Sequence, residues 1–185
     1  KSGLLQAPGP VQAIRSDGRT LSASGLDGNT RQGYLDLQQP VTLVLESDRG
    51  RITAGRTRWL FSAEQLESDQ PIQAELKNSK VQGRGFKLDQ RTGTVIISNS
   101  CRVEQTLETL TAQRCAWNWR SERVVADGDV VLQRTEPEQI TRASRMEAKI
   151  SDDGAIRFGQ AGARVESTIK LSPAAQEKPR RPQVS

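Results

Sequence analysis

Apolar positions along the chain follow the two-residue period of β-strands rather than the period of a helix. Short runs rich in β-branched residues recur at 41–45, 95–97, 124–125 and 130–132. Clusters of Gly, Asn, Asp and Thr separate such runs, and we expect hairpin loops at 27–29, 48–50, 90–93, 127–128 and 152–154. The pattern predicts an all-β chain.

A repeat of about 30 residues underlies this pattern. Segments 51–59 and 109–117 share the frame Ile/Leu-Thr-Ala-x-Arg-x-x-Trp. Each unit has a small residue after an aliphatic one, and these small residues, 29 to 31 positions apart, are Ala23, Ala54, Gly83, Ala112 and Ala143. Short strands repeated at this period predict stacked hairpin modules, each burying its apolar face on its neighbours.

Within each unit the apolar residues shift once between even-numbered and odd-numbered positions, a property we call parity. Ile52 and Ala54 lie at even positions, and Trp59 continues the pattern at an odd position. Because side chains alternate faces with period two, such a change needs one extra residue, which a β-bulge supplies. The residues at this point in successive units are Gly25, Arg56, Gly85, Arg114 and Arg145. A bulge repeated in every unit predicts a strongly twisted or curved sheet.

The amino-acid composition excludes several kinds of catalytic and metal site. The 185 residues include no His, which excludes His-based acid–base catalysis, Ser-His and Cys-His pairs and His-containing metal sites. No apolar run approaches the roughly 18 residues of a membrane-spanning helix. No enzyme signature is present, so we expect neither catalysis nor a cofactor nor a metal. The net charge of +5 favours anionic partners, although the charges interleave in sign.

The two cysteines, Cys101 and Cys115, lie on consecutive strand-like segments. A turn centred near position 108 would place them directly opposite each other, close enough for a disulfide in an oxidising compartment. The alternative is a pair of buried free thiols.

Most of the large apolar side chains lie in the second part of each repeat unit, after the change of parity. They either fill the inside of the β structure or line an elongated apolar groove for a ligand. The groove candidates are Trp59, Phe61, Phe86, Leu88, Trp117, Trp119, Met146 and Ile150. Arginines recur near them, but acids lie among these arginines and no nucleic-acid-binding signature is present, so we expect no nucleic-acid partner.

Two segments carry a family resemblance. Residues 81–95 (VQGRGFKLDQRTGTV) resemble the small-x-G-hydrophobic-x-x-D-x-x-x-G-x-hydrophobic hairpin of LptC and LptA, the OstA-like proteins of lipopolysaccharide export. Residues 124–132 (VVADGDVVL) are similar to the A-x-G-x-V-x-L strand pair of the same family. The match covers roughly 12–171. We expect an OstA-like domain over 1–171 and a Pro-rich, disordered tail over 172–185.

The resemblance implies a twisted β-jellyroll, open along one side and built from the repeated hairpin units. It implies lipid A acyl chains in the apolar interior, with Arg56, Arg84, Arg114 and Arg145 as a rim for the head group. Its partners would be lipopolysaccharide, an inner-membrane ABC transporter and a periplasmic bridge protein, joined edge to edge by strand addition, with homo-oligomers as a further option.

The location implied is the periplasm, with an inner-membrane anchor through an N-terminal segment absent from these 185 residues. The atypical first unit favours an LptC-like over an LptA-like role, whereas the Cys pair, the basic pI and the tail depart from the common pattern. We therefore expect a non-catalytic lipopolysaccharide carrier. The alternatives are a solidly packed β-solenoid adaptor for protein docking and a carbohydrate- or nucleic-acid-binding domain.

Overall fold

The computed structural model describes residues 3–16, 18–44, 50–150, 156–160 and 165–169. These residues form β-strands and one short 3₁₀ helix, η2 (Phe61–Ala63). The strands are β1 (Leu4–Ala7), β2 (Val11–Ile14), β3 (Thr20–Ala23), β4 (Leu26–Asn29), β5 (Tyr34–Leu37), β6 (Val41–Val44), β7 (Gly50–Ala54), β8 (Thr57–Leu60), β9 (Gln65–Leu76), β10 (Ser79–Asp89), β11 (Thr94–Glu104), β12 (Glu108–Ala112), β13 (Arg114–Asn118), β14 (Arg123–Thr135), β15 (Glu138–Ile150), β16 (Ile156–Gln160) and β17 (Val165–Ile169). The predicted all-β class is confirmed.

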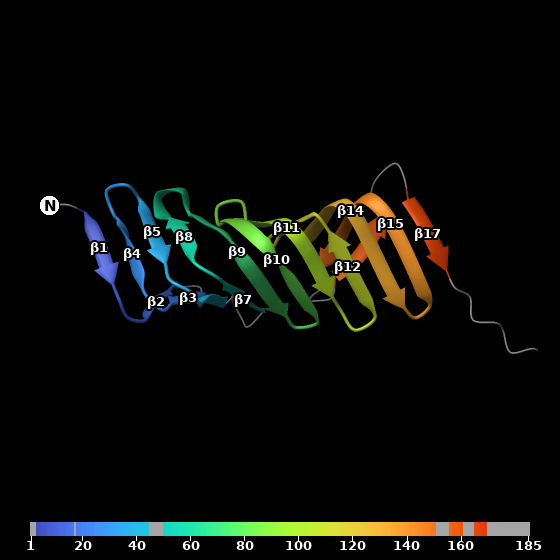
Figure 1. Ribbon diagram of the computed structural model, residues 1–185, viewed down its shortest axis with the longest axis horizontal. Coiled ribbons are helices and arrows are strands. Elements are labelled where there is room, and N and C mark those ends of the chain that lie inside the picture. Colours follow the sequence, from blue (N-terminus) through green and yellow to red (C-terminus); the bar gives the residue numbers. More distant parts are fainter. Residues whose placement is uncertain (1–2, 17, 45–49, 151–155, 161–164, 170–185) are drawn as a thin grey trace, which may run out of the picture.

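The strands form two facing layers of antiparallel pairs (Figure 1). The first layer holds β1, β4, β5, β8, β13 and β16, and the second holds β2, β3, β6, β7, β12 and β17. The long strands β9, β10, β11, β14 and β15 run through both layers, because each pairs with first-layer strands over one part and with second-layer strands over the other. The two layers are therefore one continuous sheet folded over.

The chain crosses between the layers at a kink and turns back within a layer at a hairpin. In the part of the chain that the structure describes, the kinks lie where the two layers join, which we call the kinked side, and the hairpins lie at the opposite ends of the strands, which we call the hairpin side. The predicted bulge points Gly25, Arg56, Gly85, Arg114 and Arg145 all lie at or beside kinks, where one strand or strand segment ends and the next begins or where the pairing register shifts. The predicted change therefore coincides with a kink in every unit, as a register shift beside Gly85 and Arg145 and as a break between two strands at Gly25, Arg56 and Arg114.

A second series of kinks, half a repeat away, was not predicted. It falls at Pro8–Pro10, Gln39–Pro40, Ser68–Pro71, Ser98–Ser100 and Gly128–Asp129. The backbone is in the left-handed region at Ser100 (φ 53°) and Gly128 (φ 76°). These kinks contain Pro, Ser, Asn or Asp but share no sequence motif, so the sequence pattern does not predict their positions.

Small residues lie where the layers converge. The small positions of the repeat occupy the second-layer row next to the kinks, and they are Ala23, Ala54, Gly83, Ala112 and Ala143. A Cβ on Gly83 would approach Ile97 Cγ2 to 2.3 Å. The period of small residues therefore reflects the narrow space beside the kinked side.

Two of the expected hairpin loops are wrong. Asp27, Gly28 and Asn29 belong to β4 itself, where a Cβ on Gly28 would come within 2.4 Å of the carbonyl oxygen of Tyr34. Asp127 and Gly128 lie inside β14 at its kink. Residues 90–93 do form the predicted loop. Residues 48–49 and the whole of the loop expected at 152–154 lie outside the described residues, as does the expected tail at 172–185, and Gly50 begins β7.

Each end of the folded sheet presents unpaired strand edges. Within the described chain, β1 pairs only with β4 and β2 only with β3, while β16 and β17 each pair only with β15. Leu4 and Ile14 on β1 and β2 are 72% and 70% exposed. No described helix is long and apolar enough to span a membrane.

Candidate functional site

A continuous apolar stripe on each layer faces the interior. Strand register places directly opposite residues on one face, and in the first layer this row runs through Gly28, Leu35, Trp59, Leu66, Leu88, Val95, Trp117, Val124, Ala148 and Phe158. The facing row of the second layer runs through Leu21, Leu43, Ile52, Ala74, Val81, Val103, Leu110, Leu132 and Thr141. Together they form an apolar interior that follows the length of the molecule.

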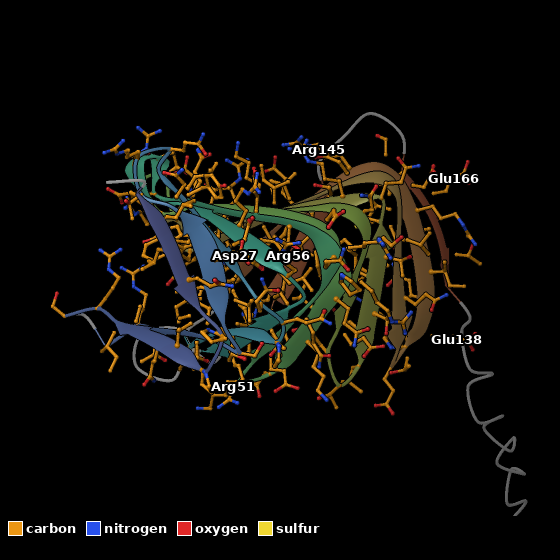
Figure 2. The ribbon with its side chains drawn as sticks, turned by 60° about the vertical axis from the view of Figure 1, so that its left-hand side comes forward. Asp27, Arg51, Arg56, Glu138, Arg145 and Glu166 are labelled. Atoms are coloured by element: carbon orange, nitrogen blue, oxygen red, sulfur yellow. A yellow bond between two sulfur atoms is a disulfide. The ribbon has the colours of Figure 1, made fainter. Side chains whose placement is uncertain are left out.

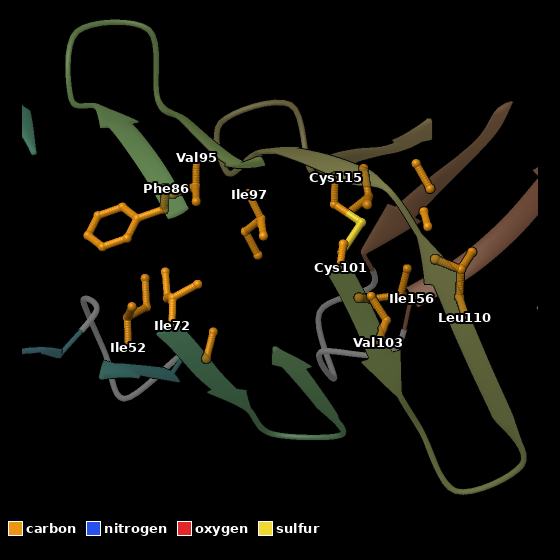
Figure 3. Packing of buried hydrophobic residues seen from close by; sticks show 14 of the residues in the cluster. Ile52, Ile72, Phe86, Val95, Ile97, Cys101, Val103, Leu110, Cys115 and Ile156 are labelled. Carbon is orange, nitrogen blue, oxygen red and sulfur yellow. A yellow bond between two sulfur atoms is a disulfide. The ribbon is translucent and has the colours of Figure 1, made fainter. Parts of the chain in front are cut away.

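This interior is largely filled by side chains. Figure 3 shows Phe86, Val95 and Ile97 opposite Ile52 and Ile72. A cavity of about 20 Å³ remains between the layers, room for about one water molecule. Its lining residues are Leu21, Val41, Leu43, Ile52, Ala54, Thr57, Leu66, Ile72, Phe86, Leu88 and Val95. An acyl chain would therefore have to part the layers or displace side chains to enter.

The predicted groove residues divide into two groups. Phe86 and Leu88 line the cavity, and Met146 is buried further along the same interior. The remaining candidates are only partly buried, and they are Trp59, Phe61, Trp117, Trp119 and Ile150. They lie toward the hairpin side, so the structure brings all eight to the first layer but not to one pocket.

The four arginines expected to form the head-group rim lie elsewhere. Arg56, Arg84, Arg114 and Arg145 are exposed, but all are at kinks, on the side where the backbone itself joins the layers. Arg56 and Arg145 (labelled in Figure 2) also pair with carboxylates, Arg56 with Asp36 at 3.4 Å and Arg145 with Asp127 at 3.1 Å. At a bulge the side chain points outward where the sheet bends from one layer to the other. These four arginines therefore do not border the hairpin side.

Other arginines occupy the hairpin side, and sequence reasoning did not assign them to the rim. Arg31, Arg91 and Arg120 each lie two residues after an Asn or Asp that ends a first-layer strand. In each hairpin that residue's side-chain Oδ1 accepts a hydrogen bond from the arginine's backbone N–H, at 2.9 Å for Asn29, 2.9 Å for Asp89 and 3.0 Å for Asn118. The spacing Asx-x-Arg, repeated in three hairpins, is the signal that could have found them.

The turn geometry also fixes the charge of Asp89. The backbone N–H of Thr92 bonds to its carboxylate at 3.1 Å and, with the Gln65 side chain and the Arg91 N–H, lowers the pKa of Asp89 below its ordinary value. The carboxylate is thus held ionised beside the Arg91 guanidinium, 3.9 Å away. Asn29 and Asn118 take the same place without a charge, so these hairpins share an exposed arginine and, among the described residues, only the β10–β11 hairpin pairs it with an acid.

Two polar contacts join the layers across the hairpin side. Arg15 Nη1, in the β2–β3 hairpin, donates to Gln90 Oε1 of the β10–β11 hairpin at 2.5 Å. The Gln105 amide, in the β11–β12 hairpin, donates to the Ile156 carbonyl and accepts from the Ile156 N–H, both at 2.8 Å. Ile156 itself is buried in the same cluster as Val103 and Leu110 (Figure 3). Both of these contacts link residues that lie far apart in the sequence.

A disulfide joins the layers near the kinked side. Cys101 and Cys115 are bonded, with their Cα atoms 5.9 Å apart, and both side chains are buried. The register is not the expected one: Cys101 lies opposite Ala112 in the second layer and Cys115 opposite Ile97 in the first. The hairpin turns nearer to residue 106, and the kinks after Ile97 and Ala112 bring the two sulfur atoms together across the fold.

One buried charge stabilises the N-terminal half. Asp36, on the outer face of β5, is 6% exposed and receives two hydrogen bonds from Arg58, at 2.7 and 2.8 Å. Arg58 in turn lies over the Tyr34 ring. The Arg58 hydrogen bonds, with the nearby charges of Arg58 and Arg56, outweigh burial and lower the pKa of Asp36.

This lowered pKa gives an acid dependence. Because the folded state holds Asp36 ionised below the pKa of the unfolded chain, the ion pair stabilises the fold fully above about pH 4 and is lost as the pH falls through the folded-state pKa. Asp36→Asn should lower the free energy of unfolding by about 1–2 kcal/mol at pH 7, since Arg58 is half exposed. Urea unfolding should show this gap narrowing as the pH falls below the ordinary Asp pKa, about 4, and closing once Asp36 is protonated in the folded state. A gap that persists unchanged in acid would contradict the assignment.

No three metal-ligating side chains come together in the part of the chain that the structure describes. The chemistry that this interior offers is apolar: two facing stripes, few internal polar groups and cations at one border.

The two-layered folded sheet of repeated hairpins is the β-jellyroll of LptA-like proteins, as the sequence predicted. A solved structure with this fold is that of LptH, the LptA-homologous periplasmic component of the lipopolysaccharide transport device of Pseudomonas aeruginosa, which aligns with a TM-score of 0.52 at 14% sequence identity. The alignment covers 80% of the present chain and 97% of the LptH chain. Neither the protein-family models nor the curated proteins gave a match to the sequence.

Proposed function

We propose that this protein is a non-catalytic periplasmic carrier of lipopolysaccharide, a component of the bridge that passes it toward the outer membrane. The observation that carries the proposal is the apolar interior running the length of an LptA-like β-jellyroll. Acyl chains gain most by leaving water for such a surface, and the gain needs no specific geometry along the stripe. A lipid acyl chain could therefore slide along the apolar stripe, as transport requires.

The borders of the interior suit the rest of the ligand. Lipid A phosphates would meet the hairpin arginines Arg31, Arg91 and Arg120, whose guanidinium groups form strong charge-assisted hydrogen bonds to phosphate. The sugars would remain outside the layers. The arginines at the kinks would then serve another role, although the sequence assigned the head group to them.

The unpaired strand edges suit the partners. β1 and β2 at one end, and β16 and β17 at the other, offer main-chain hydrogen-bond groups to strands of another protein or another copy. We propose that these edges join an inner-membrane ABC transporter and a periplasmic bridge protein, with an LptC-like role next to a membrane anchor. This assembly would extend the apolar interior from one protein into the next.

One observation favours a second function. The cavity between Leu21, Ile52 and Phe86 holds only about 20 Å³, and so tightly packed an interior suits a solid β-solenoid adaptor that docks proteins without carrying a ligand. The two functions differ in whether the layers open for lipid.

Lipopolysaccharide binding at low and high salt, with a de-acylated analogue as competitor, tests the proposal. We expect binding that survives high salt, because apolar burial is not screened, and that the de-acylated analogue does not displace. Binding that disappears in salt regardless of acylation would leave a merely basic surface. No binding at all would favour the adaptor.

The same assay locates the head group. Arg31→Gln with Arg91→Gln should weaken binding at low salt, while the matched pair Arg84→Gln with Arg114→Gln, equally exposed at the kinks, should not. Arg120 is kept, because its Nη2 donates to the Gln90 carbonyl at 3.0 Å and supports the hairpin. The opposite result would return the head group to the kinked side.

A further inference from the structure

Two tryptophans occupy equivalent positions on the first layer. Trp59 of β8 lies opposite Leu66, and Trp117 of β13 lies opposite Val95 and Val124, so both indoles face the interior in the same row. Each has an aromatic neighbour two residues on, in the same T-shaped arrangement. The ring centroids are 6.3 Å apart for Trp59 and Phe61 and 6.4 Å apart for Trp117 and Trp119. The repeat has therefore built one aromatic arrangement twice.

Both indoles carry an unused hydrogen-bond donor. Among the described side chains, the Nε1 atoms of Trp59 and Trp117 are buried and have no acceptor within hydrogen-bond distance. Trp119 Nε1 is not such a group. A buried indole N–H normally finds a partner, because leaving it unpaired in an apolar environment is costly. Two unpaired donors at equivalent positions of a repeat point to a ligand acceptor rather than to an accident of packing.

The surroundings define which acceptor fits. The rings are partly exposed toward the hairpin side, whereas the floor between them is formed by the buried Leu66, Leu88 and Val95. Four strand spacings separate the two tryptophans, about 19 Å. An acyl lipid whose chains lie on this floor would have its ester and amide carbonyls at this same border between the dry interior and solvent. These carbonyls are acceptors without charge, as a buried N–H prefers.

We propose that Trp59 and Trp117 donate hydrogen bonds from Nε1 to the acyl ester or amide carbonyls of a bound lipid, and so set the depth at which its chains lie. This inference rests on the proposed function. In the absence of lipid the two donors are sealed by the closed layers. Their satisfaction on loading offsets part of the cost of parting the layers.

The hydrogen bonds can be observed directly. Protein labelled with ¹⁵N at the indole nitrogens has only three such signals, one for each tryptophan. These can be assigned by single Trp→Phe variants. After loading with lipopolysaccharide labelled with ¹³C at its acyl carbonyls, a solid-state rotational-echo experiment should show ¹³C dephasing of the Trp59 and Trp117 signals and little of Trp119, the internal control. If the protein retains lipid but neither signal is dephased, the proposed hydrogen bonds are wrong and the carrier function is unaffected.

Binding gives the second readout. Trp→Phe keeps an aromatic side chain but removes the five-membered ring of the indole together with its N–H, so the loss of ring volume is common to every such variant. With the hydrogen bond lost as well, Trp59→Phe and Trp117→Phe should each weaken lipopolysaccharide binding about fivefold, and the double variant about twentyfold. Trp119→Phe removes the same ring volume at the tryptophan whose Nε1 is not a buried unpaired donor, so it should weaken binding by a distinctly smaller factor than either of the other two variants. Equal effects of all three variants would overturn the assignment. If wild-type protein retains no lipopolysaccharide at all, both this inference and the carrier function are wrong.

Discussion

Replacing Cys101 and Cys115 by alanine is expected to lower the melting temperature by about 6–12 °C. The disulfide closes a loop of 14 residues, for which the loss of chain entropy in the unfolded state corresponds to about 3 kcal/mol. For a chain of this size each kcal/mol shifts the melting temperature by about 2–4 °C. Thermal unfolding followed by circular dichroism measures the change.

The control for the disulfide is the wild-type protein unfolded under reducing conditions. It should melt close to the double alanine variant, since both lack the same cross-link and the two small cysteine side chains leave little volume behind. A melting temperature within about 2 °C of the oxidised wild type, in either sample, would show that the bond contributes little. The same comparison should be made with lipopolysaccharide bound, because the disulfide holds the layers together beside the kinks.

Trp117→Arg is expected to weaken lipopolysaccharide binding by more than about a hundredfold while the protein remains folded. Trp117 is partly exposed toward the hairpin side, so an arginine there can extend its guanidinium to solvent when no lipid is bound. Loading an acyl chain over it would bury that charge in an apolar environment, at a cost of several kcal/mol. Equilibrium binding, with circular dichroism to verify the fold, tests the prediction.

Ala116→Arg provides the matched control. Ala116 neighbours Trp117 on β13 but lies on the opposite, outer face of the strand, between Ile96 and Val125. An arginine at this position adds the same charge to the same strand without entering the interior. Binding lost equally in both variants would mean that charge on β13, and not the interior stripe, controls loading.

Local patterns predicted much of the fold. The strand class, the repeat of small residues and the first series of kinks follow from side-chain parity, which depends only on neighbouring residues. The second series of kinks could not be predicted in this way, because the bend is made by a different residue type in each unit, as at Pro40, Ser100 and Gly128. The expected turn at 27–29 failed because Gly28 serves close strand packing rather than a loop.

The candidate site was predicted less well than the fold. Parity placed large apolar candidates such as Trp59, Leu88 and Trp117 on the inner face, as the strand register shows. It could not tell the kinked side from the hairpin side, so it gave no reason to expect the predicted rim arginines at the kinks. The contacts Arg15–Gln90 and Gln105–Ile156 span 75 and 51 residues and depend on how the two layers lie over each other. No local pattern encodes that arrangement.

The zigzag path has a consequence for the size of the molecule. Every strand pair joins segments near each other in sequence, so one repeat of about 30 residues adds two strands to each layer and lengthens the interior by about 10 Å without changing its cross-section. The number of repeats thus works as a ruler. Evolution could alter the length of such a protein by duplicating or deleting whole units, while the cross-section of the interior stayed the same.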